Sequence, residues 1–181
     1  MCTAVSITER NHYFGRNLDY EMTFGEKICI TPRNFTFEFT NGEKLTSHYA
    51  MIGVAVNESM PLYFDGVNEK GLCAAGLNFP GKTHYFKPVQ GKNNVASFEF
   101  IPWILSKCSN VRNAKQLLMN INITDTPFSS DIKPSPLHWI IADNKECIVL
   151  EQTKDGVKIF ENKVGILTNS PQFDMHMLNL N

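Results

Sequence analysis

The chain opens, over residues 2–19, with CTAVSITERNHYFGRNLD. Residues 3–8 and 12–16 are short alternating runs of strand-forming side chains, and the polar segment 9–11 between them is short enough for a tight turn. We therefore predict an antiparallel pair of strands at the start of the chain. The far end of the second strand then lies beside the beginning of the first strand, where Cys2 stands.

The same alternation of short apolar runs and turn residues continues to about residue 77 and returns after residue 136. It predicts strands over residues 27–31, 35–40, 49–56, 70–77, 137–142, 146–153, 157–161 and 164–168. Asn41-Gly42 predicts a hairpin turn, because both residues tolerate a positive φ. The short turns between the last four strands favour an antiparallel meander.

Helical periodicity occupies the middle of the chain. The apolar side chains of residues 97–108 recur at helical spacing, which predicts a first helix. A second helix begins after Ser109 or Asn110, both of which are good N-cap residues, and its apolar positions continue to Ile121. Strands followed by helices and then by strands are typical of a layered α+β domain, and not of alternating βαβ units.

Size and composition limit the class of protein. The chain has 181 residues, 43% of them hydrophobic, so we expect one folded domain with a sizeable core over residues 1–181. Its formal net charge of -1 argues against binding to nucleic acid or to an anionic membrane surface. No apolar run is long enough to cross a membrane and no secretory signal pattern is present, which favours a cytoplasmic protein.

The cysteines and histidines do not indicate a metal centre. The 5 cysteines, at positions 2, 29, 73, 108 and 147, include no C-x-x-C pair, and the 5 histidines are dispersed. We therefore expect reduced thiols, no disulfide framework and no zinc site.

Cys2 is the residue that points to chemistry. Removal of Met1, which bacterial methionine aminopeptidase carries out when the next side chain is small, would leave Cys2 with a free α-amine. Such an amine has an unperturbed pKa of about 7.7 to 8.0 and lies within reach of the thiol, for which it can act as a base. On position alone, a small residue tolerated after Met1 is the alternative interpretation.

Two charged residues are expected beside Cys2. Arg16 and Asp19 follow the second predicted strand, whose end lies next to Cys2. A guanidinium there favours the thiolate, and a carboxylate holds the α-amine. An ordinary surface ion pair is the alternative.

Six short motifs resemble one family in the same order along the chain. They are MCT at residues 1–3, FGRNLD at 14–19, NEKGL at 68–72, AGLNFP at 75–80, LHW at 137–139 and LTNSP at 167–171. Together they resemble the choloylglycine hydrolase family of N-terminal nucleophile amidases, and its bile salt hydrolases more than its penicillin V acylases.

The resemblance implies roles for five residues. It makes Cys2 the nucleophile, with Arg16 and Asp19 positioning and activating it. It also makes Asn78 and Asn169 the side chains of the oxyanion hole. For the two asparagines taken alone, turn-forming residues before Phe-Pro and Ser-Pro are the alternative interpretation. Penicillin V acylases typically have tyrosine at the position of Asn78, which favours bile salts as substrates.

The implied reaction is hydrolysis of the amide that joins a steroid acyl group to glycine or taurine, without a metal or organic cofactor. Three segments with large apolar residues, 18–24, 60–64 and 128–132, are expected to be loops that hold the steroid in this family. Their expected steroid contacts, for each of which core packing is the alternative, are Leu18, Phe64, Phe128 and Ile132.

The family's members run well beyond this length. The resemblance therefore implies the N-terminal portion of a four-layer αββα sandwich, the N-terminal nucleophile hydrolase fold, that is incomplete in this chain and lacks a further active-site arginine. It also implies a bacterial source and a homotetramer for the full-length form. Penicillin V acylase activity, N-acyl homoserine lactone acylase activity and a truncated, non-catalytic fragment stay open as alternatives.

Overall fold

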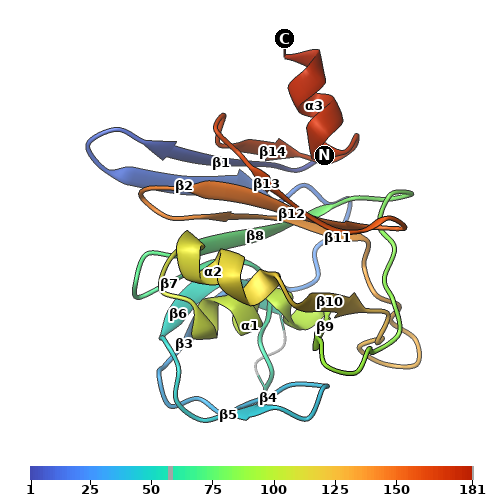
Figure 1. Ribbon diagram of the computed structural model, residues 1–181. Coiled ribbons are helices and arrows are strands. Elements are labelled where there is room, and N and C mark those ends of the chain that lie inside the picture. Colours follow the sequence, from blue (N-terminus) through green and yellow to red (C-terminus); the bar gives the residue numbers. More distant parts are fainter. Residues whose placement is uncertain (57–58, 181) are drawn as a thin grey trace.

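The protein is seen here in a computed structural model that describes residues 1–56 and 59–180 (Figure 1). Its strands are β1 (Thr3–Thr8), β2 (His12–Asn17), β3 (Lys27–Thr31), β4 (Phe37–Glu38), β5 (Lys44–Leu45), β6 (Met51–Val56), β7 (Leu62–Asn68), β8 (Cys73–Asn78), β9 (Asn93–Ala96), β10 (Ile121–Thr124), β11 (Leu137–Ala142), β12 (Cys147–Thr153), β13 (Gly156–Glu161) and β14 (Ile166–Thr168). Its helices are the 3-10 turn η1 (Ser97–Glu99), α1 (Phe100–Lys107), α2 (Val111–Leu118) and α3 (Phe173–Asn179).

Two sheets stack on one another. The smaller has the strand order β14-β1-β2, and the larger has the order β13-β12-β11-β8-β7-β6-β3. Neighbouring strands are antiparallel in both sheets. The smaller sheet lies over the part of the larger sheet that contains β8, β11 and β12, and α1 and α2 cover the opposite face (Figure 1). The expected α+β class and layered arrangement are confirmed.

Each interface between layers holds its own apolar core. Between the sheets, inward-facing residues of the strands pack with the start of α3; these are Cys2, Ala4, Ala75, Leu77, Ile140, Val149, Leu167 and Phe173. The larger core lies between the larger sheet and the helices, and it contains both Trp103 of α1 and Trp139 of β11. Cys2 therefore lies inside the molecule, between the two sheets.

The helical layer follows from its sequence. All of α1 except Lys107 is buried, which agrees with its mostly apolar composition. In α2 the side chain of Asn110 accepts the N–H of Asn113 at 2.9 Å and caps the helix, as expected for an asparagine at this position. The strands before and after this helical pair, β9 and β10, run parallel to each other.

The structure corrects several predicted strands. The strand expected over residues 35–40 is reduced to the two residues of β4, which forms a hairpin with β5 around Asn41-Gly42. The strand expected over 70–77 begins only at Cys73. Asn68 causes this delay, because its side-chain oxygen accepts the N–H groups of Lys70 (3.0 Å) and Leu72 (3.1 Å) and so stabilises a turn.

Other elements also differ from the prediction. The sequence predicts a loop where β7 lies and no helix at α3, and the second helix ends at Leu118 rather than at Ile121, which begins β10. β14 leaves the predicted meander and pairs with β1. Gly165 explains this exit, because its φ of 72° turns the chain, and its carbonyl accepts the N–H of Ser6 at 2.7 Å.

Gly165→Ala is expected to destabilise the fold. A Cβ at this position would lie 2.1 Å from the carbonyl oxygen of Ser6, at a positive φ that side chains other than glycine avoid. Together the strain and the clash are expected to cost about 2–3 kcal/mol in the free energy of unfolding, measured by urea denaturation. Gly156→Ala is the matched control, since Gly156 also has a positive φ (101°) but open space around its Cβ position. Equal losses in both variants would mean that the close approach to Ser6 is not important.

Glu69 contributes stability that depends on pH. The guanidinium of Arg33 donates to both carboxylate oxygens of Glu69, and the N–H of Ala50 donates to the same carboxylate at 3.0 Å. These partners lower the pKa of Glu69 from 4.5 to about 2. Because the pKa is lower in the folded chain, the contribution is present above pH 4.5 and is lost as the pH falls towards 2. We expect Glu69→Gln to be less stable than the wild type at pH 6, with a difference that shrinks between pH 4.5 and 2; a constant difference across that range would contradict the assignment.

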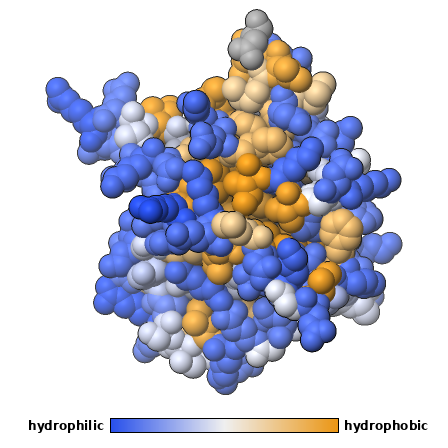
Figure 2. Space-filling view, in the orientation of Figure 1, coloured by the Kyte–Doolittle hydropathy of each residue, from blue (hydrophilic) through white to orange (hydrophobic). Residues whose placement is uncertain are grey.

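Part of the surface is apolar. Figure 2 shows hydrophobic side chains gathered from α3 downward across the middle of one face, and the exposed residues of α3 and its end include Met175, Leu178 and Leu180. Among the helices in the described ranges, none has the length and hydropathy to cross a membrane.

Candidate active site around Cys2

Cys2 directly precedes β1, and only 2% of this residue is exposed. Pairing of β1 with β2 on one side and with β14 on the other fixes this end of the chain in the middle of the smaller sheet. Side chains alternate along a strand, so Cys2 and Ala4 point to the same, inner face. The thiol is therefore directed towards β8 and β11 of the larger sheet.

Three polar side chains hold the backbone around Cys2. The N–H of Cys2 donates to Oδ1 of Asn169 at 2.7 Å. Asn17 accepts the N–H of Thr3 at 2.6 Å and donates to the carbonyl of Met1 at 3.0 Å. The terminal ammonium of Met1 forms an ion pair with Asp19, which raises the pKa of that ammonium. In this structure the Cys2 nitrogen is thus a peptide amide, and Asp19 holds the amine of the preceding residue.

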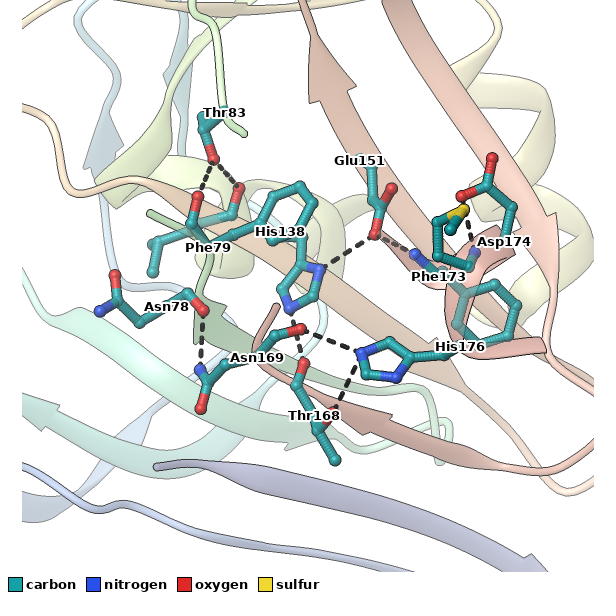
Figure 3. Close-up of polar contacts among 12 residues, drawn as sticks. Asn78, Phe79, Thr83, His138, Glu151, Thr168, Asn169, Phe173, Asp174 and His176 are labelled. Carbon is teal, nitrogen blue, oxygen red and sulfur yellow. Dashed lines mark hydrogen bonds and ion pairs between the residues drawn. The ribbon is translucent and has the colours of Figure 1, made fainter. Parts of the chain in front are cut away.

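Asn169 links Cys2 to the end of β8. While its side-chain oxygen accepts from Cys2, its Nδ2 donates to the carbonyl of Asn78 at 2.7 Å (Figure 3). Asn169 follows β14 directly and Asn78 ends β8, so one side chain bridges the two sheets. In Figure 3 the side-chain amide of Asn78 extends away from the Asn169 side chain. The structure therefore brings Cys2, Asn78 and Asn169 together.

Arg16 points into the space between the sheets. It pairs with Ala4 in the β1–β2 register, so its side chain faces inward on the same side as Cys2. The side chain is only 4% exposed; Nη1 donates to the Phe64 carbonyl at 3.4 Å and lies 3.8 Å from Asp65. Within the described part of the chain, Nε and Nη2 have no hydrogen-bond partner. A buried guanidinium with two unused donors is suited to an anionic group.

The surroundings of Arg16 change the pKa of two neighbouring side chains, Asp65 and Tyr20. Burial raises the pKa of Asp65, while the N–H of Val54 and the charge of Arg16 act in the opposite direction. Burial also raises the pKa of Tyr20, on which Cys2 and Arg16 act electrostatically in opposite senses.

The apolar residues predicted to hold a ligand fall into two groups. Phe64 lies on β7 and not in a loop, which corrects that part of the prediction, and its ring contacts Tyr20 and Phe24 with centroid distances of 6.1 and 6.3 Å. Leu18 follows β2 in the segment that leads to this aromatic group. Phe128 instead stacks edge-on with Phe98 beside the helical layer, at 5.3 Å.

Ile132, the last of the predicted steroid contacts, and three of the other cysteines lie away from Cys2 in the sequence. Ile132 is 54% exposed in the loop that precedes β11. Burial raises the pKa of the thiols of Cys73, Cys108 and Cys147 to about 12, so these three thiols remain protonated at neutral pH. Among the residues that the structure describes, no group of three or more His, Cys, Asp or Glu is placed to hold a metal ion.

Sequence reasoning missed Asn17 and Tyr20. Asn17 stands opposite Thr3 in the register, between the two predicted charged residues, and its position at the end of a strand beside the chain start was the available signal. Tyr20 and Phe24 carried a weaker signal, as aromatic residues in a segment without regular structure.

The comparisons with known proteins concern the whole length of the chain. The family model of linear amide C–N hydrolases, choloylglycine hydrolase family, matches residues 2–181. The bile salt hydrolase/transferase of Lactiplantibacillus plantarum is 48% identical over 182 residues, which cover 100% of this chain and 56% of that protein. The bile salt hydrolase/transferase of Clostridium perfringens is 43% identical and is covered to 57%.

Solved structures give the same result. A cysteine-to-alanine mutant of the conjugated bile acid hydrolase from Clostridium perfringens superposes with a TM-score of 0.94 at 42% identity, over 100% of this chain and 57% of that one. The penicillin V acylase of Agrobacterium tumefaciens, with a TM-score of 0.80 and 22% identity over 98% of this chain and 55% of that one, shares the fold. The chain thus spans little more than half the length of these relatives. With a family match from Cys2 onward and a fold shared along its whole length, the chain belongs to the choloylglycine hydrolase family of linear amide C–N hydrolases.

Proposed function

We propose that this chain carries the nucleophile of a cysteine amidase that hydrolyses glycine- or taurine-conjugated bile salts. The observation that carries the proposal is the hydrogen bond of 2.7 Å from the Cys2 nitrogen to Asn169, whose side chain also reaches the carbonyl of Asn78. A cysteine nitrogen held by a side chain, with the thiol buried between two sheets, is the arrangement that a terminal nucleophile needs. Relatives named as bile salt hydrolases support the choice of substrate.

In the proposed reaction Cys2 acts in its mature form, after Met1 has been removed. The amine of Cys2 takes the proton of the thiol, and the thiolate sulfur attacks the amide carbon. The carbon–nitrogen bond then breaks, and the Cys2 ammonium gives its proton to the departing nitrogen of glycine or taurine. Water hydrolyses the resulting thioester, which releases the bile acid and restores the thiol.

The charged neighbours have distinct parts in this proposal. Arg16 stabilises the thiolate through the two guanidinium nitrogens that have no partner within the described chain. Asp19, which binds the ammonium of Met1, is the carboxylate for the new terminal ammonium once Met1 is absent. Asn78 and Asn169 donate to the oxygen that becomes negative in the tetrahedral intermediate.

The aromatic group of Tyr20, Phe24 and Phe64 is the proposed binding surface for the steroid, together with Leu18 before it. Tyr20 and Phe24 lie in the segment that follows Arg16, and Phe64, whose carbonyl accepts from Arg16, contacts both rings from β7. Phe24 is 52% exposed, so apolar surface is available in this region. Phe128 and Ile132 remain predicted contacts from a second loop.

The remaining expectations concern the protein as a whole. We propose that these residues act as one N-terminal portion of a longer single domain, since the relatives extend well past the region matched here. A bacterial source and a homotetramer of the longer form remain predictions from the family resemblance. A cytoplasmic location remains a prediction from the sequence pattern.

A direct assay tests the proposed function. The chain, confirmed by mass spectrometry to begin at Cys2, is incubated with glycocholate and taurocholate, and the free glycine and taurine are measured. Phenoxymethylpenicillin and a long-chain N-acyl homoserine lactone serve as competing substrates. Faster release of phenoxyacetic acid, or of the fatty acid, would replace bile salts by that substrate, whereas no release from any substrate would make this chain a non-catalytic fragment.

A further inference from the structure

His138 is a fully buried histidine that the proposed reaction does not use. It lies on β11, its ring stacks on Phe79 with a centroid distance of 4.2 Å and an angle of 7°, and it is 0% exposed. Glu151, on the neighbouring strand β12, is also 0% exposed, and its Oε1 lies 3.2 Å from Nδ1 of His138. Figure 3 shows this pair beside Asn78 and Asn169. Burying two ionisable groups is costly, so their retention in the core requires an explanation.

The hydrogen bonds of His138 fix where its protons are. Nε2 lies 2.8 Å from the carbonyl oxygen of Thr168, and a carbonyl can only accept, so Nε2 must carry a proton. Nδ1 then shares a second proton with the carboxyl group of Glu151. Oε1 of Glu151 also accepts the N–H of Phe173 at 2.9 Å, while Oε2 is buried without a partner within the described chain. Glu151 therefore selects the form of the ring that donates to Thr168.

The His138 ring contacts a sequence neighbour of each asparagine of the proposed oxyanion hole. Phe79, on which the ring stacks, follows Asn78 directly, and Thr168, to which the ring donates, precedes Asn169 directly. The side chain of Asn169 then closes the arrangement by donating to the carbonyl of Asn78 at 2.7 Å. The ring thus contacts one backbone neighbour of each asparagine, and the two asparagines come from different sheets.

We propose that His138 and Glu151 form a positioning pair, which holds Asn78 and Asn169 in register across the two sheets for amide hydrolysis. The role in hydrolysis rests on the proposed function, whereas the placement of Asn169 does not. The pair acts through Phe79 and Thr168 and has no contact with the reacting atoms in this assignment. It is a positioning device, not an acid or base of the reaction.

Four variants separate positioning from simple packing. His138→Leu removes the donor, while His138→Gln keeps a donor near the place of Nε2. Glu151→Gln keeps the shape of the side chain. The amide oxygen of the glutamine still accepts from Phe173 and can only accept from Nδ1 of His138, so Nδ1 must carry the proton of the neutral ring. Nε2 of His138 then has no proton to donate to the carbonyl of Thr168. The control is His48→Leu, because His48 is also buried between two backbone carbonyls, at 2.8 Å each, but packs on Phe37 in the other core.

The first readout needs no catalysis. The side-chain amide signals of Asn169 are identified in ¹H–¹⁵N spectra by their loss in Asn169→Ala, and the ring nitrogens of His138 report which of them is protonated. We expect the Asn169 amide protons to exchange at least about tenfold faster in His138→Leu and Glu151→Gln, and at the wild-type rate in His138→Gln and His48→Leu. In Glu151→Gln the ¹⁵N spectrum should show that Nε2 has lost its proton. Unchanged Asn169 signals in a folded Glu151→Gln protein would overturn the proposal, even if His138→Leu does not fold.

The second readout is hydrolysis of glycocholate. We expect kcat to fall about a hundredfold in Glu151→Gln, the loss typical of a small misplacement of catalytic groups, with KM nearly unchanged, and to recover in large part in His138→Gln compared with His138→Leu. A parallel loss in His48→Leu would show a general packing effect and contradict the proposal. If the wild type itself releases no glycine, the proposed function fails, while the spectra still decide whether the pair positions Asn169.

Discussion

Removing Met1 is expected to raise the rate of bile salt hydrolysis by about 10²–10⁴-fold, the usual contribution of a general base. With Met1 attached, the Cys2 nitrogen is an amide that donates to Asn169 and cannot accept the proton of the thiol. Without Met1, the same nitrogen becomes a primary amine, with one further N–H bond and a lone pair that can accept the proton of the thiol. The measurement compares two preparations of the same chain, with and without Met1, for glycine released from glycocholate.

The controls for this result use Cys2 and Asp19. Cys2→Ala without Met1 should be inactive, which shows that the thiol and not the free amine is the nucleophile. Asp19→Asn without Met1 should keep part of the activity, because it keeps the shape but loses the charge that holds the ammonium. Equal rates with and without Met1 would contradict the proposed mechanism, since the peptide nitrogen cannot replace the amine.

Asn169→Ala is expected to reduce kcat by at least about a hundredfold. The side chain supplies an acceptor for the Cys2 nitrogen and a donor beside Asn78, and removal of one oxyanion-hole donor alone typically costs about 2.7–4 kcal/mol in the barrier. Because these interactions are proposed to strengthen in the transition state, KM should change little. Steady-state kinetics with glycocholate measure both constants.

Asn162→Ala is the matched control for this prediction. Asn162 is also a buried asparagine, 3% exposed, and it holds the other end of β14 by donating to Ile166 at 3.0 Å and accepting from Gly165 at 2.9 Å. Its replacement should lower the free energy of unfolding by about 1–3 kcal/mol and leave kcat nearly unchanged. If both variants lose kcat equally, Asn169 would have only a structural role.

The sequence predicts elements whose signals are local. β1 and β3 appear with the predicted bounds, because each alternates strand-forming residues between clear turns, and the helix cap at Asn110 was recognisable from its residue type. β7 was missed because its alternation is interrupted by Gly66, which the structure requires for a close backbone approach, since an added Cβ would lie only 3.0 Å from the carbonyl oxygen of Ile52.

The site is less predictable because it is built from distant segments. Nothing near residue 166 reveals that β14 pairs with β1 and not with β13, since strand propensity does not identify the partner. The proximity of Arg16 and Asp19 to the chain start followed from one tight turn. The roles of Asn78 and Asn169 came only from the family resemblance, and no local pattern predicted that a buried His138 lies between their loops.

The pairing of β1 with β14 also has a consequence for how the chain folds. The pairing of Thr3 with Thr168 closes a loop that contains almost every other element. Closing such a long loop costs conformational entropy before the contacts between β1 and β14 can stabilise the fold. During synthesis, the first strand to leave the ribosome therefore waits for its second neighbour until residue 168 has followed. Cys2 and Asn169 meet only at that late step, so the nucleophile is assembled after the larger sheet that supports it.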